Sequence, residues 1–145
     1  MSGNLKKLAA AAGLLILISG NSMAQEDLVF LSPAGQRVTL SSLRGKVVLL
    51  FFSGVQDPQC RDEFKMLQSL TDRYRNKDVS IFWVSVNPAS VASDERLKSP
   101  CGPAGNVAVL RDPDQSAYRR LATGIKQLPT IVVLDKQGQA GAKAR

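Results

Sequence analysis

Apolar runs along the chain predict a set of β-strands. The run at 46–52 does not alternate with polar positions, which is typical of a central strand covered on both faces. A second apolar run, at 79–86, and a shorter one, at 131–134, predict further strands. The stretches 28–31 and 36–40 flank a Ser-Pro-Ala-Gly turn and predict an N-terminal β-hairpin.

One amphipathic helix is predicted between the two longest strands. Asp57 is a suitable N-cap and Pro58 a suitable first helical residue. Apolar positions between Cys60 and Tyr74 then recur at helical spacing, and the pattern ends near Asn76. A strand, a helix and a strand of these lengths predict a right-handed βαβ unit with parallel strands.

The second half of the chain is less regular. Residues 87–106 are rich in Pro and Gly and predict a loop with a short helix at 90–98. A short strand is expected at 107–110, followed by a helix that starts at Asp112-Pro113 and runs through Leu121. Residues 139–145 can supply at most a short, alanine-rich edge strand.

Residues 1–24 have the features of a secretory signal peptide. Two early lysines precede an apolar run from Leu8 to Ile18, and a small-x-small cleavage site ends at Ala24. Cleavage there leaves one domain, residues 25–145, with no stable membrane span. The protein is therefore expected to be exported to the periplasm; an uncleaved N-terminal anchor is the alternative.

Composition removes several functional classes. The formal net charge is +7, but basic residues are interleaved with acids and form no run with aromatic residues, so no nucleic-acid partner is expected. The chain has no histidine, which excludes Cys-His and Ser-His catalysis and most zinc sites. We expect neither a metal nor a cofactor. Two cysteines, Cys60 and Cys101, remain as candidate reactive groups, and export makes a disulfide possible.

Two separated motifs carry a family resemblance. Residues 45–63 read GKVVLLFFSGVQDPQCRDE, and residues 124–138 read GIKQLPTIVVLDKQG. The first is similar to G-K-V-V-L-V-N-F-W-A-x-W-C-x-x-C-R-x-E and the second to G-[VI]-x-x-x-P-T-x-x-x-x-D-x-x-G. Both patterns occur in TlpA-like exported thiol–disulfide oxidoreductases of the thioredoxin superfamily, a redoxin (AhpC-TSA-like) group. The resemblance implies an α/β thioredoxin-like fold: a mixed sheet with flanking helices and an N-terminal β-hairpin.

The resemblance also implies roles for individual residues. Cys60 matches the second, resolving cysteine, and Glu63 matches an acid that tunes thiol protonation. Pro129 matches a proline that is cis in the family and faces the cysteines. With Leu128 and Thr130 it would form the surface that binds an extended peptide or a thiol- or disulfide-bearing protein.

The chain departs from the family pattern at three places. Asp57 stands at the position of the attacking cysteine, and Gln56 replaces the preceding tryptophan. The family's last strand and C-terminal helix are shortened here, which predicts an under-covered sheet face. A carboxylate can hold the start of the helix but cannot attack a disulfide, and its charge disfavours a thiolate at Cys60. Asp57 acting as a base for Cys60 is the weaker interpretation.

Cys60 and Cys101 leave alternatives open. Cys60 is either an inert, partly buried thiol or a reactive one, and Phe51, Cys60 and Glu63 also fit a peroxiredoxin pattern. Cys101 is by default a free or intermolecular thiol in a Gly/Pro loop. However, loops that follow parallel strands gather near functional sites, so a Cys60–Cys101 disulfide is the competing hypothesis.

The functional prediction is an exported thiol–disulfide oxidoreductase whose redox activity is altered or reduced because Asp57 replaces the attacking cysteine. The first alternative is a non-catalytic thioredoxin-fold module that binds a partner through the Pro129 surface. The second is a one-cysteine peroxidase using Cys60.

Overall fold

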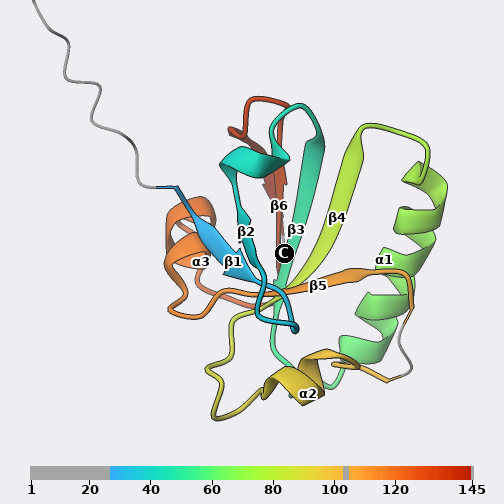
Figure 1. Cartoon of the computed structure of the whole chain (residues 1–145), viewed down its shortest axis with the longest axis vertical. Coiled ribbons are helices and arrows are strands. Elements are labelled where there is room, and N and C mark those ends of the chain that lie inside the picture. The colour runs from blue at the N-terminus through green and yellow to red at the C-terminus, as the bar shows by residue number, and fades with distance from the viewer. Residues whose placement is uncertain (1–26, 103–104, 145) are drawn as a thin grey trace, which may run out of the picture.

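A computed structural model describes residues 27–102 and 105–144, which form one seven-stranded sheet with helices on both faces (Figure 1). The predicted signal peptide lies outside the described residues. The strand order is β2-β1-β5-β4-β3-β6-β7. The elements in chain order are β1 (Val29–Leu31), β2 (Arg37–Thr39), the 3-10 helix η1 (Ser41–Leu43), β3 (Val47–Ser53), α1 (Cys60–Tyr74), β4 (Val79–Ser85), α2 (Asp94–Leu97), β5 (Ala108–Arg111), α3 (Ser116–Leu121), β6 (Thr130–Leu134) and β7 (Ala140–Ala144).

The centre of the sheet is parallel. β3 pairs with β4 in register from Val47↔Val79 to Ser53↔Ser85, and β4 pairs in parallel with β5. β6 runs antiparallel to β3, with Thr130 opposite Phe52. The C-terminal ends of β3, β4 and β5 and the start of β6 therefore lie at one end of the sheet. The beginning of α1 and helix α2 lie at this same end (Figure 1).

Each face of the sheet packs against its own set of helices. Leu50 and Phe52 of β3 join the cluster that contains Leu121 of α3, whereas Phe51 joins the cluster that contains Leu67 of α1. This alternation follows from the two-residue repeat of a strand. It confirms the prediction that the apolar run at 46–52 forms a strand buried on both faces.

Two predicted helix starts are wrong by a few residues. α1 begins at Cys60 rather than Pro58, because residues 54–59 form turns in which the Cys60 N–H donates to the Asp57 carbonyl at 3.1 Å. α3 begins at Ser116 rather than next to Asp112. The buried Asp112 carboxylate instead reaches forward and accepts the N–H groups of Ala117 and Tyr118. Both acids organise a helix start from outside the helix.

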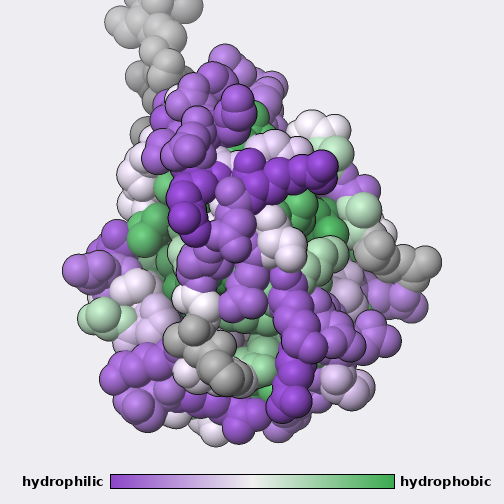
Figure 2. Space-filling model, turned by 90° about the vertical axis from the view of Figure 1, so that its right-hand side faces the viewer, coloured by the Kyte–Doolittle hydropathy of each residue, from purple (hydrophilic) through white to green (hydrophobic). Residues whose placement is uncertain are grey.

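The α1 face of the sheet is not fully covered. Leu49, Ile131 and Val133 are only half-buried there. Figure 2 shows apolar surface beside the hydrophilic band of this face. In the described residues β7 is the last element, and its side chains are exposed. Within residues 27–102 and 105–144, no helix is long and apolar enough to cross a membrane.

Replacing Leu67 by Ala tests the α1 packing. Leu67 is 0 % exposed, so the substitution leaves a cavity and should lower the free energy of unfolding by about 2–5 kcal/mol. Met66, its neighbour on the same helix, is 42 % exposed, and Met66→Ala should change that free energy by no more than about 0.5 kcal/mol. Urea denaturation of both variants measures the difference; equal losses would show that α1 does not pack as described.

Candidate functional site

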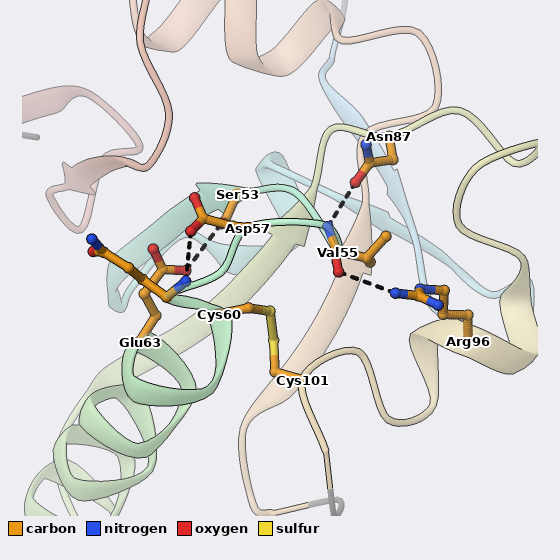
Figure 3. The surroundings of a disulfide bond; sticks show 9 residues. Ser53, Val55, Asp57, Cys60, Glu63, Asn87, Arg96 and Cys101 are labelled. Atoms are coloured by element: carbon orange, nitrogen blue, oxygen red, sulfur yellow. Dashed lines mark hydrogen bonds between the residues drawn. A yellow bond between two sulfur atoms is a disulfide. The ribbon is translucent and has the colours of Figure 1, made fainter.

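The turn between β3 and α1 is held by contacts from two other segments. The Val55 N–H donates to Asn87 Oδ1 at 2.8 Å, just beyond the end of β4. The Val55 carbonyl accepts a hydrogen bond from the Arg96 guanidinium of α2 at 3.2 Å (Figure 3). These bonds fix the backbone immediately before Cys60, so the start of α1 has a defined position relative to β4 and α2.

A disulfide joins Cys60 to Cys101 (Figure 3). The two Cα atoms are 5.4 Å apart, within the range that a disulfide requires. The default expectation for Cys101, a free or intermolecular thiol, is therefore wrong. Spacing along the chain could not reveal this pairing, because 41 residues separate the two cysteines.

The segment that carries Cys101 is anchored by Arg111 at the end of β5. This side chain is only 4 % exposed. It donates to the carbonyls of Asn87 and Ala92 and forms an ion pair with Asp94 at 2.8 Å. A buried guanidinium of this kind is stable only with such partners. It ties the loop after β4, and α2 with it, to the sheet.

Asp57 occupies the turn that precedes α1. Its Oδ1 accepts the Gln59 N–H at 2.8 Å, and its carbonyl accepts the Cys60 N–H. The predicted role as N-cap needs correction: the cap position is Gln59, and Asp57 shapes the turn one step earlier. The acid thus organises the backbone of the turn that leads into α1.

Glu63 is a buried carboxyl one helical turn after Cys60. Its side chain accepts the Ser53 hydroxyl at 3.0 Å through Oε2, and Oε1 has no hydrogen-bond partner among the described residues. Burial raises the pKa of Glu63, the Ser53 hydrogen bond partly offsets this, and the Asp57 charge raises it further. Glu63 is therefore a buried carboxyl that keeps its proton to a higher pH than an exposed one, beside Ser53 and one helical turn after Cys60.

Leu128, Pro129 and Thr130 lie at the same end of the sheet as the disulfide. The Leu128–Pro129 peptide bond is cis, and Thr130 pairs with Phe52, next to the end of β3. Thr130 is buried and its hydroxyl donates to the Gln127 carbonyl, whereas Leu128 is 40 % exposed. The register therefore brings the second sequence motif beside the first.

The matching family model settles the relationship of the chain. A model of the AhpC/TSA family matches residues 21–141. The chain belongs to the AhpC/TSA family. This AhpC/TSA protein is 29 % identical over 105 residues to the thiol–disulfide oxidoreductase ResA of Bacillus subtilis (strain 168). The match covers 72 % of this chain and 56 % of ResA, so the chain spans little more than half of that relative's length.

Solved structures support the thioredoxin-like fold. The exposed lipoprotein thioredoxin of Streptococcus pneumoniae has a TM-score of 0.69 at 20 % identity, covering 81 % of this chain and 87 % of that one. A thioredoxin-like protein of Aeropyrum pernix has a TM-score of 0.64 at 19 % identity, covering 81 % and 80 %. At these identities the likeness concerns the fold alone. The fold and the redoxin relationship expected from the sequence are confirmed.

Sequence reasoning missed the residues that support this site: Asn87, Arg96, Arg111 and the role of Ser53 toward Glu63. A polar residue closing each apolar strand, Ser53 and Asn87, is the only signal that could have indicated two of them. The described residues contain no group of three or more Cys, Asp or Glu side chains placed to hold a metal ion.

Glu63→Gln tests the raised pKa. The native carboxyl keeps its proton to a higher pH than the unfolded one, so its stabilising contribution is complete below pH 4.5 and is lost as pH rises through the native pKa. The glutamine of Glu63→Gln does not titrate, so the variant does not lose this stability as the pH rises. Urea denaturation of both disulfide-intact proteins at pH 4 and pH 7 should show Glu63→Gln gaining stability relative to wild type at pH 7. A difference independent of pH would contradict the assignment.

Proposed function

We propose that this AhpC/TSA protein is an exported thiol–disulfide oxidoreductase whose redox centre is the Cys60–Cys101 disulfide. The observation that carries the proposal is the pairing itself. Cys60 stands at the family's active-site position, and its partner comes from a different loop because Asp57 replaces the nearby cysteine. The altered pairing gives the chain a two-electron couple without a Cys-x-x-Cys motif.

In this proposal the oxidised protein accepts two electrons and two protons from a dithiol. Two thiols of the partner protein become a disulfide, and Cys60 and Cys101 become thiols; the reverse reaction reduces a partner disulfide. Glu63 takes up or supplies a proton near Cys60. The surface of Leu128, Pro129 and Thr130 would bind the partner's extended backbone beside the sulfur atoms.

A binding module without redox chemistry is the second candidate. The exposed Leu128 side chain favours it, because a large apolar group beside Pro129 can contact a bound peptide whether or not the disulfide reacts. The peroxidase alternative has less support. Its cysteine would have to meet peroxide as a thiolate, whereas Cys60 is only 5 % exposed and packs among apolar side chains.

Export is part of the proposal. The basic and apolar N-terminal pattern that ends at Ala24 supports it, and disulfides persist in oxidising compartments. Mass spectrometry of the protein recovered from the periplasm should find a mature N-terminus at Gln25. Recovery of intact residues 1–24 in the membrane fraction would instead indicate an N-terminal anchor.

Equilibration with buffers of oxidised and reduced dithiothreitol or glutathione tests the redox function. Alkylation mass shifts should reveal a two-electron transition between about −120 and −270 mV, where protein oxidoreductases lie. A midpoint below about −300 mV would identify a structural disulfide. The binding module would then be the remaining candidate function. The double variant Asp57→Cys, Cys101→Ser is the matched positive control, because it places a Cys-x-x-Cys motif on the same scaffold.

A further inference from the structure

The two sulfur atoms of the disulfide differ in access. Cys60 is 5 % exposed and packs in the apolar cluster with Val55 and Phe64. Cys101 is half-buried and lies at the edge of that cluster, in the loop that follows α2 (Figure 3). Thiol–disulfide exchange requires the incoming thiolate to reach the sulfur that it attacks. Cys60 is almost fully covered by its packed neighbours, whereas Cys101 keeps part of its surface exposed.

We propose that Cys101 is the cysteine that exchanges with the partner and that Cys60 is the leaving and resolving thiol. This inference rests on the proposed redox function. It differs from the expectation that Cys60, the cysteine within the family motif, is the one that reacts with the partner. Cys60 keeps the resolving position that its place in the motif implies, and Cys101 supplies from another loop the function that Asp57 cannot perform.

The exchange balances in two steps. A partner thiolate attacks Cys101 Sγ, the bond between Cys101 and Cys60 breaks, and its electron pair leaves on Cys60 Sγ, which takes up a proton. A second partner thiolate then attacks the partner sulfur of the mixed disulfide and releases Cys101 as a thiolate. Two partner thiols are oxidised to a disulfide, and Cys60 and Cys101 are reduced.

Charge favours the same assignment. Arg61, in the first turn of α1, lies against Gly102, the residue after Cys101: a Cβ placed on Gly102 would be 4.0 Å from Arg61 Nε. The Arg61 guanidinium therefore lies near the backbone of the loop that carries Cys101, and a positive charge there favours a thiolate. At Cys60 the N-terminus of α1 favours a thiolate, but the Asp57 carboxylate opposes it. In the reduced protein Cys101 is thus the better placed nucleophile.

Single-cysteine variants test the assignment directly. Cys60→Ser keeps only the Cys101 thiol, and Cys101→Ser keeps only the Cys60 thiol. With oxidised glutathione as the probe, the Cys60→Ser variant should form the mixed disulfide at least about tenfold faster than the Cys101→Ser variant. In denaturant the two rates should become equal. A native ratio near one, or a faster Cys60 thiol, would overturn the proposal.

The wild-type protein provides a test that does not depend on how the variants fold. A peptide with a single thiol is mixed with the oxidised protein, the reaction is quenched with acid, and the mixed disulfide is mapped. Attachment at Cys101 is expected; attachment at Cys60 would overturn the assignment. Failure of the redox function would show separately, as a midpoint below the biological range in the equilibration experiment.

Arg61→Gln tests the charge argument in the Cys60→Ser background. It should slow mixed-disulfide formation at Cys101 near neutral pH and move the pH dependence of that rate to higher pH. Arg73→Gln, at an exposed position near the other end of α1, is the matched control and should leave the profile unchanged. An identical profile for both would show that Arg61 does not act on Cys101.

Discussion

Parallel pairing of β3 with β4, and of β4 with β5, is the constraint on which the site depends. The C-terminal ends of neighbouring parallel strands lie at the same end of the sheet, so the segments that follow these strands meet there. Cys60 follows β3, and Cys101 lies between β4 and β5. The fold therefore brings together two cysteines that are 41 residues apart. Pro129, which precedes the antiparallel strand β6, lies at the same end of the sheet.

Buried polar contacts turn this proximity into a fixed geometry. Arg111 binds the loop after β4, and Asn87 and Arg96 bind the turn before Cys60. The disulfide then links the start of α1 covalently to the loop between β4 and β5. In the chain-entropy account, closing a loop of this length stabilises the native state by about 4 kcal/mol, a large share of the stability of a small domain. Reduction of the disulfide is therefore expected to lower the free energy of unfolding of the domain.

Asp57 stabilises the turn before α1 through hydrogen bonds to the backbone. The turn before α1 needs a group that accepts backbone N–H donors, and an aspartate supplies it through its side chain and its carbonyl. The requirement for a nucleophile is independent of that geometry. In the proposed function Cys101 would supply it from another loop, and Arg111 ties the first part of that loop, up to Asp94, to the sheet.

The amino-acid sequence was sufficient to predict the main strands, the long helix, the thioredoxin-like architecture and the family. These follow from local pattern: the apolar run at 46–52, the helical spacing after Cys60 and the two motifs are visible within short windows. Helix starts at Cys60 and Ser116 were displaced from the predicted positions, because turn and side-chain bonds to the backbone compete with the first helical turn.

The partner of Cys60, the burial of Glu63 and the anchoring role of Arg111 became visible in the three-dimensional fold. Each depends on contacts between residues that are distant in the chain, and no local pattern encodes their distances. A cysteine in a Gly/Pro loop and an arginine at a strand end have many possible environments. Strand order and register select one of them, and with it the charge, access and chemistry of the site.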